Sequence, residues 1–143
     1  MRGRALPEPS AEGSRWLDTP LPGTRYVPGV GDHPHRDPAR VALARPEDAI
    51  DRHHLFALGC ELYRQHYFWE AHEAWETAWR EAPRDSAERE VLGALIQSAA
   101  AVLATHLGRE RAVEDLVARA ASRLDEVVAS SGPAWRGLDV AAL

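Results

Sequence analysis

Histidine and glutamate side chains that could bind a metal ion or move a proton crowd into one short stretch, YFWEAHEAWETAWREAP, residues 67–83. An imidazole near its ordinary pKa of about 6.5 suits proton transfer, and a neighbouring carboxylate raises its basicity. On a helix, His72 and Glu76 are i,i+4 neighbours that should both point partly inward, whereas Glu73 should turn further out. The stretch therefore predicts either a binding site or a set of structural contacts.

The apolar residues around His72 predict which face this helix buries. Counting 100° per residue, one stripe collects the side chains Phe68, Ala71, Trp75, Ala78 and Trp79. Glu70 falls nearly opposite the stripe, where we expect it to stabilise the positive end of the helix dipole. Trp69 lies at the flank, and we expect this tryptophan to receive the N-terminal arm or a partner.

A second inward histidine is predicted on the next helix. His106 falls on the apolar stripe made by Val91, Leu95, Ala99, Val102 and Leu103. An unpaired buried polar group costs about 1 to 3 kcal/mol, so His106 needs a partner, which His72, Glu76 or a polar group of the first helix could supply. The candidate pocket therefore comprises His72, Glu76, His106, Trp75, Trp79 and Glu73.

Three interpretations of these residues stay open: a structural hydrogen-bonded network, a small-molecule pocket and a metal site. The segment HEAWE resembles the zinc motif HExxH with Glu76 in place of the second histidine, but a zinc protease also needs a third ligand and a glutamate facing the metal-bound water. The metal candidates are His72, Glu76 and His106. No spacing commits the further candidates Glu61, His53, His54 and His66. No cofactor is predicted.

The favoured interpretation is a non-enzymatic structural or interaction module with a buried His–Glu hydrogen-bond network. The alternative is a ligand- or metal-binding bundle, which could be a hydrolase or another enzyme, with a pocket formed by His72, Glu76 and His106. An inward His72 and His106 favour the first interpretation. The second requires the three side chains to converge, which a sequence does not establish.

The elements that must position these residues are helices. At 143 residues and 45% hydrophobic, the chain can build one ordinary core. Residues 1–45 hold seven of the ten prolines and show no sustained helical period, so they predict an extended arm. Residues 46–143 predict an all-α domain, a single antiparallel bundle of four main helices followed by a short tail with Trp135 and Leu138.

Helix boundaries follow from capping residues and prolines. Pro46 suits a first helical turn, and Pro83 ends the second helix. Asp85 can cap the third helix, with Glu88 completing a capping-box-like pair. The third helix is apolar or alanine on almost every side, which marks it as the central element or as one that also meets a second subunit. The fourth helix begins after Gly108 and carries one apolar stripe, Val113, Leu116, Val117, Ala120, Leu124, Val127 and Val128.

Charge and composition exclude several classes of partner. The formal net charge is −5 and the arginines are spread along the chain, so nucleic acid is not expected. No stretch has the apolar length of a signal peptide or a membrane span, which predicts a soluble, cytoplasmic protein. The single cysteine, Cys60, is expected to be a small buried hydrophobe rather than a nucleophile. A homo-oligomer or a protein partner remains possible.

Two blocks of residues in combination resemble a known family. The first is Tyr67-Phe68-x-Glu70-Ala71-His72-Glu73-x-x-Glu76-x-x-Trp79, and the second is Gly93-x-x-Ile96-Gln97-x-Ala99 followed by a histidine near the end of that helix. Over about residues 50 to 142 the chain is similar to the small all-helical bacterial and archaeal family called domain of unknown function 309. The resemblance implies a compact helical bundle with no established activity and no catalytic residues to transfer.

Overall fold

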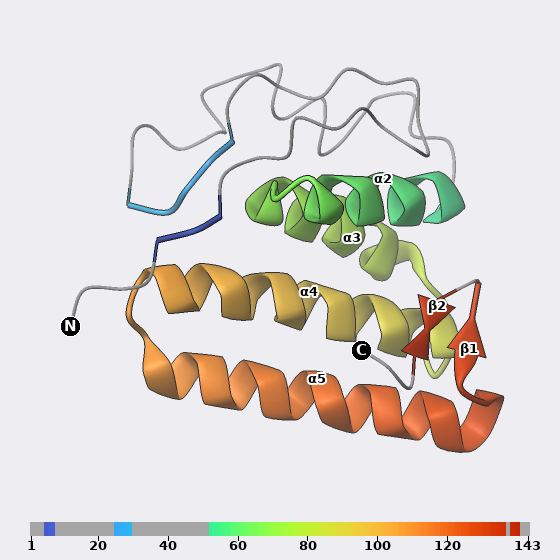
Figure 1. Ribbon diagram of the computed structural model, residues 1–143. Helices are drawn as coiled ribbons and strands as arrows, with labels where there is room; N and C mark the ends of the chain where they lie inside the picture. Colours follow the sequence, from blue (N-terminus) through green and yellow to red (C-terminus); the bar gives the residue numbers. More distant parts are fainter. Residues whose placement is uncertain (1–4, 8–24, 30–51, 137, 141–143) are drawn as a thin grey trace.

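Four helices and a short β ribbon make up the structure, a computed structural model that describes residues 5–7, 25–29, 52–136 and 138–140 (Figure 1). The helices are α2 (Arg52–Arg64), α3 (Phe68–Glu81), α4 (Ala87–His106) and α5 (Glu110–Ser131). The strands are β1 (Ala134–Trp135) and β2 (Leu138–Asp139). The predicted helix start at Pro46 and most of the predicted arm lie outside the described residues. The all-α bundle is confirmed.

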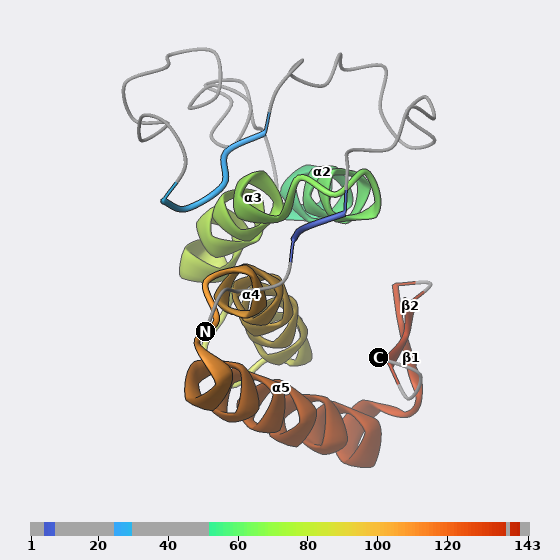
Figure 2. The same cartoon turned by 60° about the vertical axis from the view of Figure 1, so that its left-hand side comes forward.

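Helix α4 is the central element, as its apolar composition predicted. It packs against α3 on one side and α5 on the other, while α2 packs on α3 (Figures 1 and 2). Its fully buried positions include Val91, Leu92 and Ala99. From α3, Trp75 enters the same core with 1% of its surface exposed, and its indole Nε1 donates to the Phe56 carbonyl oxygen at 3.1 Å.

Helices α2 and α4 each end at a residue whose backbone is left-handed. After α2, His66 has φ 69°, and the amide of Tyr67 donates to the Leu62 carbonyl, which terminates the helix in a Schellman motif. Gly108, with φ 68°, does the same after α4. The start of α4 differs from the prediction, because Ser86 rather than Asp85 is the N-cap and accepts the Arg89 amide at 3.1 Å.

The C-terminal tail forms a ribbon that the sequence pattern did not predict. Strands β1 and β2 pair antiparallel, with Trp135 opposite Leu138. The Trp135 ring meets Phe56 of α2 edge-on at 5.3 Å, and Val140 is 2% exposed. Two residues per strand are too short for an alternating pattern to be recognised, so only packing reveals this ribbon.

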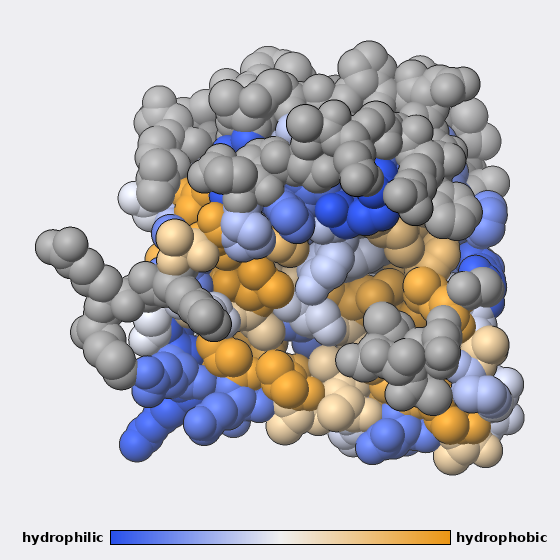
Figure 3. Space-filling view, in the orientation of Figure 1, coloured by the Kyte–Doolittle hydropathy of each residue, from blue (hydrophilic) through white to orange (hydrophobic). Residues whose placement is uncertain are grey.

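The predicted apolar stripe of α5 is only partly covered. Ala120, Leu124 and Val127 are buried, but Val117 is 52% exposed. Val117 lines an apolar groove of about 410 Å³ between α4 and α5, and apolar surface follows the line between these helices (Figure 3). Within the described part of the chain, no helix has the length and apolar character needed to cross a membrane.

Candidate functional site

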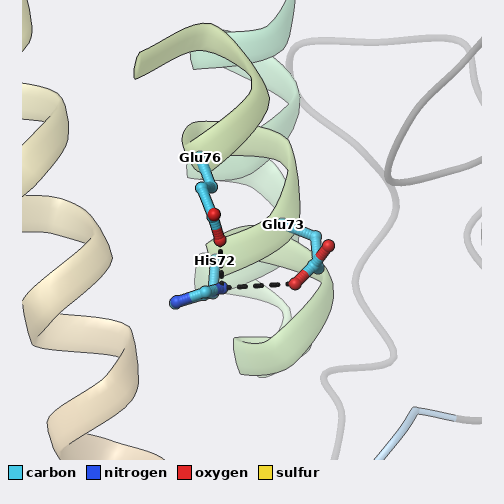
Figure 4. A group of neighbouring side chains, drawn as sticks. All are labelled: His72, Glu73 and Glu76. Atoms are coloured by element: carbon cyan, nitrogen blue, oxygen red, sulfur yellow. Dashed lines mark ion pairs between the residues drawn. The ribbon is translucent and has the colours of Figure 1, made fainter. Parts of the chain in front are cut away.

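His72, Glu73 and Glu76 converge on one side of α3 (Figure 4). The imidazole Nδ1 of His72 lies 3.6 Å from Glu73 Oε1 and 3.7 Å from Glu76 Oε2. Each of the three side chains is partly covered, with 24%, 12% and 27% exposed respectively. The imidazole ring extends from α3 toward α4, while both carboxylates approach its Nδ1 edge.

The predicted hydrogen bond between His72 and Glu76 is not formed. Both carboxylates are beyond hydrogen-bonding distance from Nδ1, and this buried nitrogen has no hydrogen-bond partner among the described residues. The prediction that Glu73 turns outward was also wrong, because Glu73 is less exposed than His72 or Glu76. Its side chain bends back along the helix toward the imidazole (Figure 4).

His106 is not in this group, although it was predicted to share a pocket with His72 and Glu76. Of the His, Cys, Asp and Glu side chains in the described ranges, the set that could hold a metal is His72, Glu73 and Glu76. Arg89 packs over the Trp79 ring, so the antiparallel pairing of α3 and α4 places His72 level with a residue near 96. His106 lies about ten residues, or about 15 Å, further along α4.

Trp75 and Trp79 have structural roles rather than places in a pocket. Trp75 is buried in the core and bonded to the Phe56 carbonyl. The guanidinium of Arg89 lies 3.9 Å from the centre of the Trp79 ring and donates to the carbonyls of Trp79 and Ala82 at the end of α3. None of the six predicted pocket residues lines the groove between α4 and α5.

A second polar site lies where α2 meets α3, against residues 25–29 of the arm. The Tyr26 amide donates to Glu70 Oε1 at 2.7 Å, and the Tyr26 ring meets Trp69 edge-on at 5.3 Å. Arg25 donates to the His66 carbonyl at 3.0 Å and to the carbonyl oxygens of Leu6 and Pro7. The prediction that Trp69 receives the arm or a partner is therefore confirmed for the arm.

The burial of Glu70 contradicts the prediction that was made from its position around the helix. It was placed opposite the buried stripe, yet none of its surface is exposed. The phase of a helix predicts one buried face, but the arm adds a second covering surface at the start of α3. Nothing in the helical pattern indicates this; the only sequence signal was the apolar and aromatic content of the arm around Tyr26.

The buried polar residues nearest this corner are Glu61 and Gln65, both 0% exposed. Glu61, considered as an extra metal ligand, instead accepts from Arg64 at 2.9 Å and from the Gln65 side-chain amide at 3.0 Å. Buried hydrogen-bonded carboxylates thus occur in this protein, but at the α2–α3 corner. His53 and His54 are exposed on the first turn of α2.

Cys60 is unsuited to nucleophilic chemistry. Burial raises the pKa of its thiol from 9.0 to about 11; the neighbouring Glu61 charge acts in the same direction, and a hydrogen bond with Trp75 opposes both. The thiolate is the reactive form, so the folded protein should be almost inert to alkylation near neutral pH.

We expect iodoacetamide at about pH 8 to modify Cys60 far more slowly in the folded protein than in urea, as measured by mass spectrometry. Because the folded pKa is raised, the stability that this thiol contributes is complete below pH 9.0 and is lost as the pH rises toward about 11. Equal alkylation rates in the two states would contradict the assignment.

Comparison with known proteins identifies one related family. Residues 56–116 match the family described as Domain of unknown function (DUF309), as the two sequence blocks indicated. The matched region contains most of α2, all of α3 and α4 and the start of α5, including His72, Glu73 and Glu76. No curated protein and no solved structure matches the chain.

Proposed function

Because residues 56–116 match the family described as Domain of unknown function (DUF309), and that description names no activity, we propose a role that the protein's own contacts support. The domain is a non-enzymatic interaction module whose α2–α3 corner binds an extended peptide segment. In this protein the segment is residues 25–29 of its own arm. The domain comprises residues 46–143, and residues 1–45 form the arm.

The observation that carries the proposal is the bond between the Tyr26 amide and the buried Glu70 carboxylate, 2.7 Å long. A hydrogen bond to a charged acceptor contributes about 1.5 to 3 kcal/mol and recognises peptide backbone. Two side-chain contacts add selectivity. The His66 carbonyl accepts from Arg25, and Trp69 contacts the Tyr26 ring, so the corner selects an Arg–Tyr pair.

The same contacts suggest how two copies could associate. An arm that leaves its own corner could occupy the corner of a second copy, which would produce an arm-exchanged homodimer without any new contact. A partner protein with an extended Arg–Tyr segment could compete for the corner. The net charge of −5 supports a protein ligand over nucleic acid, and the single cysteine fits a reducing, cytoplasmic compartment.

We expect Tyr26→Ala in the full chain to release the arm, so that trypsin cleaves after Arg25 faster than in the parent protein. The released variant should then bind a synthetic peptide of residues 20–31 in trans, measured by calorimetry. The same peptide carrying Tyr26→Ala is the matched control. Failure of the native peptide to bind a protein whose arm is demonstrably released would overturn the proposal.

A further inference from the structure

His72 Nδ1 lies between two carboxylates, and its distances to both are too long for hydrogen bonds. Charge-assisted N–H···O bonds are about 2.7 to 2.9 Å long, whereas the two separations here are 3.6 and 3.7 Å. Two ligand atoms that each lie about 2.0 to 2.2 Å from a tetrahedral zinc ion are roughly 3.3 to 3.6 Å apart. The observed spacing is therefore close to that of atoms sharing one metal ion.

The environment of the imidazole supports the same interpretation. A buried nitrogen without a hydrogen-bond partner costs about 1 to 3 kcal/mol, and His72 Nδ1 has none among the described residues. The same nitrogen faces both carboxylates (Figure 4). A cation bound there would satisfy the nitrogen and neutralise the two negative charges on either side of it.

We propose that His72, Glu73 and Glu76 bind a single divalent transition-metal ion. One imidazole nitrogen and two carboxylate oxygens suit Zn²⁺, Mn²⁺, Fe²⁺ or Co²⁺ better than Mg²⁺ or Ca²⁺, which prefer ligand sets made only of oxygen. Three protein ligands leave at least one coordination position for water or a small anionic ligand. None of the three ligands is among the residues that contact Arg25 or Tyr26 at the peptide-binding corner, so the two proposals are tested by different variants.

The helix supplies the three ligands in a nearly assembled arrangement. The ligand atoms lie within 4.8 Å of one another, so rotation of the glutamate side chains can complete the set without movement of α3. Arg80 contacts Glu76 Oε1, which leaves Oε2 directed at His72. All three ligands come from two adjacent turns of a helix that is packed on both α2 and α4.

The test is a calorimetric titration of ZnCl₂ into the full chain after chelator treatment and dialysis. We expect one zinc ion per chain, and at least a roughly tenfold weaker affinity in His72→Gln and in Glu76→Gln. Glu81→Gln, an exposed glutamate at the end of the same helix, is the matched control and should bind as the parent does. MgCl₂ at the same concentrations should produce no binding signal.

Two further measurements keep folding separate from ligation. Circular dichroism melts should show that each variant is folded, since glutamine is close in size to both residues that it replaces. With CoCl₂, the parent protein should develop visible d–d absorption that is lost in His72→Gln. The proposal would be overturned if the parent did not bind zinc, or if His72→Gln and Glu76→Gln both bound zinc as tightly as the parent does. It would also be overturned if the parent bound magnesium as tightly as zinc.

Discussion

Trp75→Ala is expected to lower the free energy of unfolding by about 3 to 5 kcal/mol, the range measured for removal of a buried aromatic side chain. The Trp75 side chain is 1% exposed and packs beside Tyr63, with ring centres 5.7 Å apart. The substitution leaves a large cavity and also removes the indole donor from the buried Phe56 carbonyl. Urea denaturation followed by circular dichroism measures the loss.

Trp69→Ala on the same helix is the control for this prediction. Trp69 is only half-buried and contacts Tyr26 of the arm, so its removal should destabilise the bundle much less. A loss for Trp75→Ala no greater than that for Trp69→Ala would show that Trp75 is not the anchor of the core.

Gly59 provides an independent check on the packing of Trp75. A Cβ atom at position 59 would lie 2.2 Å from Trp75 Nε1, so Gly59→Ala cannot be accommodated while the indole is in place. The cost of Gly59→Ala should therefore shrink when Trp75 is already alanine. Additive effects in this double-mutant cycle would contradict the direct contact.

Arg64→Met is expected to cost about 3 kcal/mol, because it removes the guanidinium that pairs with the buried Glu61 carboxylate. Glu61 is 0% exposed, and its Oε1 lies 2.9 Å from Arg64 Nη2. Removing one partner of a buried ion pair costs about 3 to 5 kcal/mol, and the partial exposure of Arg64 places this pair at the lower end. Methionine retains the apolar stem of arginine, so the loss reports on charge rather than on packing.

Two variants test that explanation by urea denaturation. The double variant Glu61→Met with Arg64→Met should recover most of the lost stability, because the buried carboxylate that Arg64 stabilises is then absent as well. Arg80→Met breaks an exposed pair with Glu76 and should have little effect. If the double variant were as unstable as Arg64→Met alone, the buried charge would not be the cause.

Local periodicity was sufficient to predict the helices and the core face of α3. Ala71, Trp75 and Ala78 recur at helical spacing and are all buried, and the apolar composition of α4 indicated its central position. These predictions succeed because the burial of an apolar stripe depends on residue spacing within one element. The capping prediction at Asp85 was one residue early, since Asp85 and Ser86 are both good N-cap residues and only the backbone geometry selects between them.

Periodicity assigns a residue to a face of its helix but not to a level along the bundle. His106 and His72 were both placed inward, yet the connection between α3 and α4 leaves them at different heights. Glu73 instead joins His72 and Glu76, because side-chain rotation brings two adjacent residues of one helix together. The positions of the Cα atoms around the helix do not specify how the side chains rotate.

By itself, the sequence determined an all-α bundle with a proline-rich N-terminal segment, because helix propensity, apolar spacing and chain-breaking residues are local properties. Only the tertiary structure decided that Glu70 is buried beneath Tyr26 and that the metal-competent group is His72, Glu73 and Glu76. The physical reason is that both depend on which segments and side chains meet in the folded protein. A segment more than forty residues away covers Glu70, and the metal-competent group depends on side-chain rotamers that residue spacing does not encode.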